Sequence, residues 1–512
     1  MKRPASFVVP AFIGGLWLAA VTPTISPLLT GLLLIISCIV LLISKGRRLV
    51  VTFMILAAFL GLFRMQHNQS VSPMEMLLAQ LQSDRQPLRL EAVVLDHRRV
   101  SAFTSRYQVE IRHIAIEDQG LKTRLPVILQ VRDYEGICHQ AAPGTIITID
   151  SFTLSHDLSR HQGEPYLKNW QSQGFQAVME LPASGITVTG TPVNWRSAAY
   201  RARNRSEKMI DSLLPEPENR VLKSLFFGNQ GYLDTEMRAL FTRTGTAHLI
   251  AVSGLHVGIL AMFCQAALGK LGAGKRMTRL ITVVFVWFYA AMAGFPISIL
   301  RAGTMYTLYA AALPLERRYD AKSILLWSGI LFLWLNPLSL YTVSFQLSFA
   351  AVAVILWLYP RLKKQISFLP FTGSNLLLIT LAAQLGTWPI IAWHFGTFSM
   401  VSLPANLLII PMIGILMPLA LIMTVAGFFS PILAAGPAFL VEGGTRYLIT
   451  VADWFHRIPY AEVTIPSLHP GWLMLYYLLL AFICLRLKKR GAAVDEKEWK
   501  MDGEWPKGLD PR

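Results

Sequence analysis

The stretch "TAHLIAVSGLHVGIL", Thr246–Leu260, is apolar enough to enter a lipid bilayer, yet it contains two histidines, a serine and two glycines. A polar side chain inside a bilayer is costly unless it pairs with another group or faces water. The stretch therefore predicts a helix that packs closely against other helices, borders a hydrated path, or does both.

The spacing of the polar and small residues within this stretch supports both roles. Ser253 and His256 are three residues apart and share a helix face. Gly254 and Gly258 have the small-xxx-small spacing that lets two helices approach closely. A serine beside a histidine could also act as nucleophile and base, but no acid is spaced to orient the histidine and the local sequence is not Gly-x-Ser-x-Gly. We therefore predict no catalytic residue.

The whole chain has the composition of an integral membrane protein. Of its 512 residues, 53% are hydrophobic and 15% are charged, whereas about a quarter of the residues in soluble domains are charged. Because a helix crosses the hydrocarbon core with about 20 apolar residues, we expect a polytopic α-helical membrane protein with about twelve transmembrane helices. The apolar runs lie near residues 7–21, 24–44, 49–63, 246–268, 280–294, 299–313, 323–335, 341–358, 374–395, 402–427, 437–455 and 471–485.

Lysine and arginine residues are distributed unevenly between the two ends of these runs, although the net charge is +17. Clusters such as residues 45–48, 270–279 and 361–364 fall on one side if the runs alternate, whereas connections such as 295–298 and 396–401 contain none. The positive-inside rule then predicts that both termini are cytoplasmic. Most of the charge therefore indicates topology rather than a nucleic-acid footprint.

Residues 1–63 hold the first three predicted helices, and residues 64–190 after them have a different pattern. Apolar and polar residues alternate in segments such as "RYQVEIRHIAI", residues 106–116. The alternation predicts five or six strands of a small extracytoplasmic β-barrel of the OB type. Residues 86–185 hold ten Lys or Arg and eleven Asp or Glu. This balance gives only weak support for phosphate binding, so a neutral barrel that shapes the outer mouth is the alternative.

Residues 191–245 are predicted to form an extracytoplasmic helical connector to the helices at 246–487, which precede a cytoplasmic tail at 488–512. The segment "NWRSAAYRARNRSEKMIDSLL", residues 194–214, predicts a basic amphipathic helix. Such helices most often lie on a lipid headgroup surface. A role in receiving a polyanion is the alternative.

Further polar residues occur within the carboxy-terminal apolar runs. Arg301 lies near the exterior end of its run, where it can either snorkel to the surface or face a cavity. Gln346 and Gln384 lie deeper, so their amides need partners on other helices or along a path. Glu442 and Arg446 are four residues apart and are expected to pair along one helix.

The run at 402–427 carries Pro404, Pro411 and Pro418 at intervals of seven, which places them near one helix face. Each proline removes a backbone donor, and broken helices of this kind line the cavities of transporters. With Asn406 nearby, we predict that these prolines break the helix and that it lines a cavity. A kinked packing helix is the alternative.

Patterns that would signal metal or nucleotide chemistry are absent from the sequence. The four cysteines include no Cys-x-x-Cys pair, and no His-x-His-x-Asp-His cluster occurs that could hold a dinuclear metal site. The turn "GKLGAGKR", Gly269–Arg276, lacks the Ser or Thr that follows the lysine of a P-loop. We therefore predict no metal, no cofactor and no ATPase activity.

Four blocks of the sequence resemble, in order and spacing, the signature blocks of the ComEC family of competence proteins. The exterior OB-like domain between amino-terminal and channel helices resembles the architecture of that family as well. The blocks are "FTRTGTAHLIAVSGLHVGI" (241–259), "FPISILRAGTMY" (295–306), "NPLSLYTVSFQLSFAAV" (336–352) and "AQLGTWPIIAWHFGTFSMVSLPANLLIIP" (383–411).

The resemblance implies an inner-membrane channel that passes one strand of transforming DNA into the cytoplasm. Such a channel needs an exterior DNA receptor, a separate nuclease, and a cytoplasmic motor or single-strand-binding proteins, and it could be a homo-oligomer. Many family members continue into a metallo-β-lactamase-like domain, whereas about 25 residues follow the last run here. We therefore expect translocation without cutting, and the protein is not expected to be an enzyme.

Two other functions remain open for the same helical core. One is transport of a small solute, and the other is a non-transporting role in membrane assembly. Carried onto this sequence, the resemblance and the polar pattern together place the channel residues at His248, Ser253, Gly254, His256, Gly258, Arg301, Gln346, Gln384, His394 and Asn406.

Overall fold

The structure is a computed structural model of the chain. The three helices predicted within residues 1–63, and the tail after residue 491, lie outside the part that it describes. It describes residues 89–99, 104–116, 119–132, 141–150, 152–157, 170, 175–190, 195–313, 321–365, 374–465 and 470–491.

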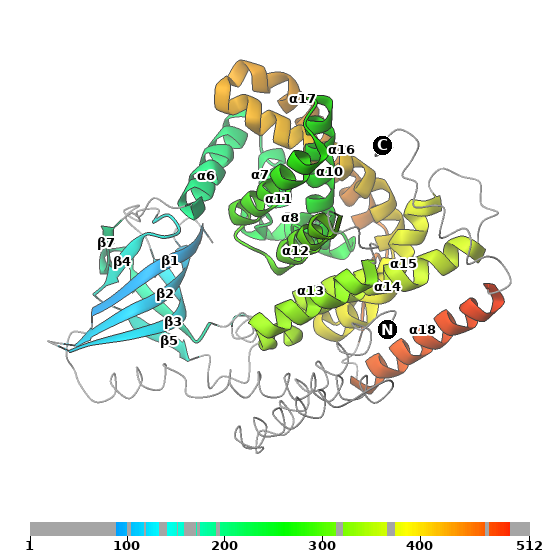
Figure 1. Ribbon diagram of the computed structural model, residues 1–512, viewed down its shortest axis with the longest axis horizontal. Coiled ribbons are helices and arrows are strands. Elements are labelled where there is room, and N and C mark those ends of the chain that lie inside the picture. Colours follow the sequence, from blue (N-terminus) through cyan, green and yellow to red (C-terminus); the bar gives the residue numbers. More distant parts are fainter. Residues whose placement is uncertain are drawn as a thin grey trace.

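A β-sheet forms one end of the molecule and a large helical body forms the other, with helix α6 between them (Figure 1). Successive residues of a strand point to opposite faces of a sheet, and β3 accordingly buries Leu125, Val127, Leu129 and Val131 in alternation. The strands are β1 (Arg89–Arg99), β2 (Thr104–Ile116), β3 (Gln119–Arg132), β4 (Ile146–Ile149), β5 (Thr153–Asp157), β6 (Ala177–Pro182) and β7 (Ile186–Gly190), with a 3-10 turn at Ala183–Gly185.

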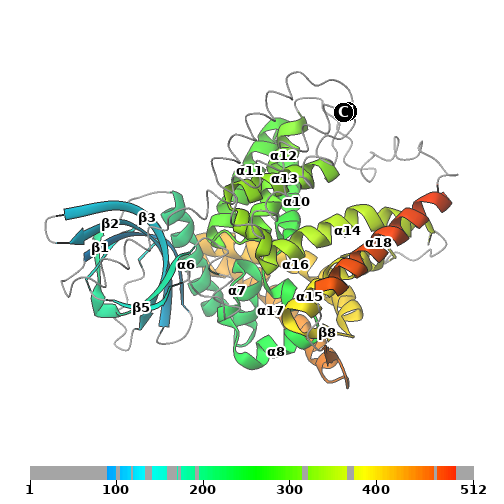
Figure 2. The ribbon, with the colours of Figure 1, turned by 90° about the horizontal axis from the view of Figure 1, so that it is seen from below.

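The strand order in the sheet is β5-β6-β3-β2-β1-β4-β7, and every pair is antiparallel except β3 with β6. The long strands curve around the core (Figure 2). Hydrogen bonds do not join the two end strands, β5 and β7, so the described sheet is not a closed barrel. The predicted strands are therefore present, while the predicted closure is absent from the ladder of hydrogen bonds.

Helices make up most of the carboxy-terminal half, and those after residue 253 coincide closely with the apolar runs of the sequence. They are α6 (Trp195–Leu213), α7 (Glu218–Phe227), α8 (Thr235–Arg243), α9 (Ala247–Ile250), α10 (Gly254–Lys270), α11 (Lys275–Met292), α12 (Ile297–Ala312), α13 (Ala321–Leu335), α14 (Val343–Gln365), α15 (Ser374–Phe395), α16 (Ser402–Phe429), α17 (Pro431–His456) and α18 (Pro470–Gly491). Short elements accompany them: 3-10 turns at Gln230–Tyr232 and Pro337–Tyr341, and strands β8 (Thr397–Ser399) and β9 (Glu462–Thr464).

Within the described residues, three helices are long and apolar enough to cross a membrane: α14, α15 and α16. Helices α10 and α13, and residues 471–484 of α18, are apolar but shorter. The chain is thus mostly helical with the character of a membrane protein, as its composition predicts.

The helices fall into two groups. The inner helix group, α6, α7, α10, α11, α12, α16 and α17, shares one continuous core. The outer helix group, α13, α14, α15 and α18, lies beside it (Figure 1) and exposes large apolar side chains such as Trp334 and Trp472. Apolar side chains on the surface of a membrane protein face lipid at no cost. The outer helix group therefore fits a lipid environment.

Helix α6 confirms the helix predicted at residues 194–214, but protein rather than lipid covers its apolar face. It packs against α7, α11, α16 and α17, and Ala199 and Ile210 are fully buried. Arg203 is buried as well, and its Nε donates a 2.6 Å hydrogen bond to Glu207. The sequence predicted that this helix lies on lipid headgroups. A basic amphipathic pattern shows that one helix face is apolar, but it does not show whether lipid or protein covers that face.

Helix α16 runs without interruption from Ser402 to Phe429, so the prediction that its prolines break the helix is wrong. Pro404 lies in the first turn, where a backbone donor has no helical partner in any case. Pro411 and Pro418 lie inside the helix on the face opposite its buried residues. Packing of that buried face against α17 and α10 holds the helix together.

Candidate functional site

The chain breaks between α9 and α10 within the stretch that opened the sequence argument. Helix α9 ends at Ile250, and α10 begins at Gly254 with Ser253 as its amino-terminal cap. The Ser253 amide donates to Nδ1 of His256 at 3.0 Å, and the Ser253 hydroxyl lies 2.9 Å from the same nitrogen. These contacts form a reciprocal capping box, which satisfies donors at the start of the helix.

The hydrogen bonds also fix the proton on the imidazole of His256. A backbone amide can only donate, so Nδ1 must accept and the proton of the neutral ring is on Nε2. The side chain is 0% exposed, and Nε2 has no partner among the described residues. No carboxylate of the described residues is hydrogen-bonded to this ring. The contact between Ser253 and His256 therefore caps helix α10.

The two glycines of α10 differ in their surroundings. A Cβ at Gly254 would lie 2.9 Å from Nη2 of Arg301, so the glycine lets the guanidinium approach the start of α10. No described atom lies within 4 Å of a Cβ built at Gly258. Close helix approach at Gly258 therefore has no support among the described residues and stays a prediction.

Arg301 of α12 points into the protein and does not snorkel to the surface. Its side chain is 6% exposed, and its Nε donates a 2.5 Å hydrogen bond to the hydroxyl of Ser348 on α14. Nη1 lies 3.7 Å from the sulfur of Met305, and the guanidinium carbon is 5.8 Å from the ring centre of Phe349. Among the described residues, no carboxylate pairs with this cation.

Gln384 and Asn406 meet at one hydroxyl. Gln384 Nε2 donates to Ser402 Oγ at 2.9 Å, and Asn406 Nδ2 donates to the same oxygen at 3.0 Å. Ser402 Oγ in turn lies 3.5 Å from the carbonyl oxygen of Gly245, which also accepts from Nδ1 of His248 at 3.1 Å. The contacts join α15, α16 and the loop before α9.

The position of Gly245 in this cluster requires a glycine. Its φ is +69°, and an added Cβ would lie 2.6 Å from the Cβ and Oγ of Ser402. Sequence reasoning missed Ser402, although its position four residues before Asn406 places both on one helix face. The four-residue spacing of Ser402 and Asn406 could therefore have identified Ser402 as a candidate.

Gln346 and His394 form a second pair, within the outer helix group. Gln346 Nε2 donates to the carbonyl oxygen of Leu340 at 3.1 Å, which leaves Oε1 as an acceptor. Oε1 lies 2.8 Å from Nε2 of His394, so the histidine carries its proton on Nε2. Two residues selected separately from the sequence thus contact each other across α14 and α15.

Five polar residues bridge the inner and outer helix groups, and we call them the polar seam: Arg301, Ser348, Gln384, Ser402 and Asn406. The first bridge joins α12 to α14, and the second joins α15 to α16. Neutral hydroxyl and amide groups that bridge two apolar bodies can exchange their partners for water or for a polar cargo. The described residues contain no group of three His, Cys, Asp or Glu side chains that could hold a metal ion.

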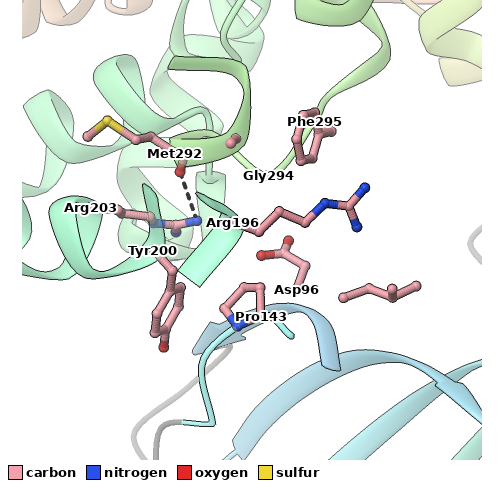
Figure 3. A pocket seen from close by; sticks show the side chains of 10 residues that line it. Asp96, Pro143, Arg196, Tyr200, Arg203, Met292, Gly294 and Phe295 are labelled. Atoms are coloured by element: carbon pink, nitrogen blue, oxygen red, sulfur yellow. Dashed lines mark hydrogen bonds between the residues drawn. The ribbon is translucent and has the colours of Figure 1, made fainter. Parts of the chain in front are cut away.

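The sheet meets the helical body at a small junction, lined by Asp96 and Pro143 on one side and by Arg196, Tyr200 and Arg203 on the other (Figure 3). Tyr200 OH lies 2.8 Å from Nδ1 of His97, and burial raises the pKa of this tyrosine. The junction encloses only about 10 Å³, about the volume that one water requires. It is therefore a contact surface rather than a ligand pocket.

Cationic and aromatic side chains are exposed beside this junction. The Arg196 guanidinium lies 5.7 Å from the ring centre of Trp195 and 5.5 Å from that of Phe295. Trp195 is 54% exposed, and its ring meets Phe295 edge to face at 5.9 Å. Phe295 has a φ of +54°, which is a strained backbone conformation for a residue with a side chain. Exposed rings beside an arginine can stack on nucleic-acid bases.

A network beneath this surface fixes helix α6. Arg203 Nη1 lies 3.5 Å from the carbonyl oxygen of Met292 (Figure 3). Arg203 Nη2 donates to Tyr232 OH at 2.8 Å, and Tyr232 also contacts Glu207. Burial opposes the charge of Arg203, but Tyr232 and Glu207 outweigh it and raise the pKa of the guanidinium. The charge of Arg203 therefore persists and ties α6 to the end of α11.

A family model described as "Competence protein" matches residues 225–490, which is more than half of the chain. This chain belongs to the competence protein family. All ten candidate residues of this competence-family chain lie within the matched region, whereas the sheet and helix α6 lie before it.

Three curated relatives align with this family member. It is 27% identical over 312 residues to ComE operon protein 3 of Bacillus subtilis, which covers 60% of this chain and 39% of that protein. It is 29% identical over 316 residues to competence protein ComA of Neisseria gonorrhoeae, with 58% and 43% covered. It is 30% identical over 198 residues to recombination protein 2 of Haemophilus influenzae, with 36% and 25% covered.

The competence-family chain thus aligns with less than half of the length of each of these relatives. No solved structure matches it. Family membership therefore rests on the helical region, residues 225–490.

Proposed function

We propose that this chain is the channel through which one strand of transforming DNA crosses the cell inner membrane during natural competence. Membership of the competence protein family, over the region that carries the polar seam, is the observation that supports this function most directly. The names of its relatives refer to competence and recombination. We further propose that the chain moves DNA without a nuclease or ATPase activity of its own.

The path that we propose for the strand follows the polar seam between the inner and outer helix groups. Arg301 and the amides of Gln384 and Asn406 offer polar contacts inside an otherwise apolar body. The exposed Trp195 and Arg196 beside the sheet would contact bases before they reach the seam.

The architecture that we propose has about twelve spans, cytoplasmic termini and an extracytoplasmic OB-type domain. For the OB type, the support is that β4 ends at Ile149 and β5 begins at Thr153, although the two strands lie near opposite ends of the strand order. A single bent strand made of both would close the sheet. The parallel pairing of β3 with β6 agrees with this topology.

We propose that other proteins supply the DNA binding outside the membrane, the nuclease activity and the pulling force that the channel needs. An exterior receptor would deliver DNA, a separate nuclease would remove the second strand, and a cytoplasmic motor or single-strand-binding protein would pull. The exposed apolar faces of the outer helix group suit lipid, and a second copy of the chain could also cover them.

The test compares entry of labelled duplex DNA into a competence-induced deletion strain with entry into the same strain that carries this chain. DNA outside the inner membrane and DNA in the cytoplasm are scored separately. We expect the deletion strain to accumulate DNA outside and the complemented strain to bring it in. Equal cytoplasmic entry at confirmed expression would contradict a DNA channel and favour a small-solute transporter or an assembly protein.

A further inference from the structure

Arg301 is a buried cation whose described partners are all uncharged. They are the Ser348 hydroxyl at 2.5 Å, the Met305 sulfur at 3.7 Å and the face of Phe349. A guanidinium has five N–H donors, and these contacts use two of them as hydrogen bonds. A buried charge without a counter-charge is strongly unfavourable. No anionic group of the described residues therefore balances the charge of Arg301.

The amino terminus of α10 adds further positive potential at the same place. Nη2 of Arg301 lies 2.9 Å from the position that a Cβ of Gly254 would occupy, so the guanidinium touches the first residue of the helix. The amino terminus of a helix carries about half a positive charge, and the first turn of α10 contains no acidic residue. The guanidinium and the amino terminus of the helix repel each other, and an anion that contacts both would offset this repulsion.

The donors at this position remain available for such an anion. In the capping box, the Ser253 hydroxyl accepts from the His256 amide and Nδ1 of His256 accepts from the Ser253 amide, which leaves the amides of Gly254 and Leu255 without partners in the helix. In the same turn, Nε2 of the fully buried His256 carries a proton and has no acceptor among the described residues. A second polar group of this turn is thus also unpaired.

We propose that Arg301 and the first turn of α10 form an oxyanion site of the phosphate class. A guanidinium presents paired N–H groups that match the oxygens of a phosphate, and helix amino termini bind phosphate through their free amides. The phosphate is either a phosphodiester of the moving strand, an assignment that rests on the proposed function, or free inorganic phosphate.

The first arm of the test measures binding of radiolabelled inorganic phosphate to the full chain in lipid nanodiscs, by equilibrium dialysis at low salt. Arg301→Gln removes the cation, and we expect it to weaken phosphate binding about ten- to hundredfold, the range for a hydrogen bond to a charged group. Gly254→Ala keeps the cation but adds the methyl group that displaces it, so we expect about tenfold weaker binding. Arg276→Gln, at an exposed arginine of α11, is the matched control and should bind as the wild type does.

The Gly254→Ala variant keeps the test decisive if Arg301→Gln does not insert into the membrane. Equal phosphate affinity of the wild type and a correctly inserted Arg301→Gln or Gly254→Ala variant would overturn the site. Weaker binding in Arg276→Gln to the same extent would overturn it as well, because general charge would then explain the effect.

The second arm distinguishes the two sources of phosphate. Single-stranded oligonucleotides with phosphodiester or uncharged methylphosphonate linkages compete against labelled phosphate. Competition by the phosphodiester strand alone, together with reduced cytoplasmic DNA entry in Arg301→Gln cells, supports the strand as the ligand. Competition by neither strand, with phosphate binding intact, supports an inorganic phosphate site and overturns the assignment to the strand.

The two proposals fail separately. If the wild-type chain gives no cytoplasmic DNA entry beyond the deletion strain but still binds phosphate through Arg301, the channel is contradicted and the oxyanion site is supported. If DNA enters through the wild-type chain but phosphate binding does not depend on Arg301, the site is contradicted and the channel is supported.

Discussion

At the scale of single residues, the polar groups of the membrane region pair with one another across helices. Gln346 meets His394, and Gln384 and Asn406 share the hydroxyl of Ser402. Each pairing lowers the cost of a polar group in an apolar body. A substitution at one member therefore leaves its partner unsatisfied, and the consequences can be measured.

Gln346→Leu removes the acceptor of the His394 proton. We expect lower cytoplasmic DNA entry with normal membrane insertion, because the contact joins two helices without carrying the core. The measurement is DNA entry at matched protein level. Gln365→Leu, at the exposed end of the same helix, is the control. Entry equal to the wild type in Gln346→Leu cells would remove this pair from the proposed path.

Ser402→Ala removes the common acceptor of Gln384 and Asn406. A buried donor without an acceptor costs about 1–3 kcal/mol, so we expect a lower midpoint of thermal unfolding in detergent. Ser212→Ala, at an exposed serine of α6, should leave the midpoint unchanged. An unchanged midpoint in Ser402→Ala would show that the two amides find other partners.

At the scale of elements, continuity of a helix depends on where its prolines lie. Helix α16 is continuous although it contains Pro411 and Pro418. The buried face of the helix, with residues such as Ile409, Ile413 and Ala420, packs in the common core. Prolines on the opposite face remove backbone N–H donors but leave the packing of the buried face intact.

Pro411→Ala restores a backbone donor inside α16. A proline inside a helix costs about 3 kcal/mol, so we expect the midpoint of thermal unfolding to rise and the helix content to stay the same. Circular dichroism of the purified chain measures both. A lower midpoint would indicate that the proline stabilises a bend that the neighbouring helices require.

At the scale of the whole molecule, the sheet and the helical body meet through α6. Arg203 holds that helix to the end of α11, and Tyr200 contacts His97 of the sheet. Trp195 and Arg196 are exposed at the first turn of α6, beside the loop that contains Phe295. Any strand that passes from the sheet to the polar seam would meet these rings.

Trp195→Ala removes the exposed ring at this junction. Stacking of a base on an aromatic side chain contributes about 1–3 kcal/mol, so we expect single-stranded DNA to bind the full chain about five- to hundredfold more weakly. Trp454→Ala removes a similarly exposed ring from α17 and is the control. Equal loss of binding in both variants would contradict a specific role for the junction.

Local patterns made the secondary structure predictable. Every strand of the large sheet except β5 follows the period-two alternation of residues 86–190, and α11 to α18 follow the apolar runs, because both periodicities arise from neighbouring residues. The candidate polar residues were predictable for a related reason: a bilayer makes each of them costly on its own.

The partners of those residues were not predictable, because they come from distant parts of the chain. Arg301 meets Ser348, and Gln384 meets Ser402, only once the helices pack. Sequence spacing suggested breaks at the prolines of α16, and the packing of the opposite face keeps that helix continuous.

The sequence by itself determined that this is a membrane protein with a region of alternating apolar and polar residues, since hydropathy and periodicity are properties of the chain. The sequence also determined the family, because four of its blocks match the family's signature blocks in order and spacing. Only the tertiary structure decided that the helix of Thr246–Leu260 breaks at Ser253, and that Arg301 lies against it with no carboxylate partner among the described residues. The physical reason is that the energy of a buried polar group depends on its neighbours in space.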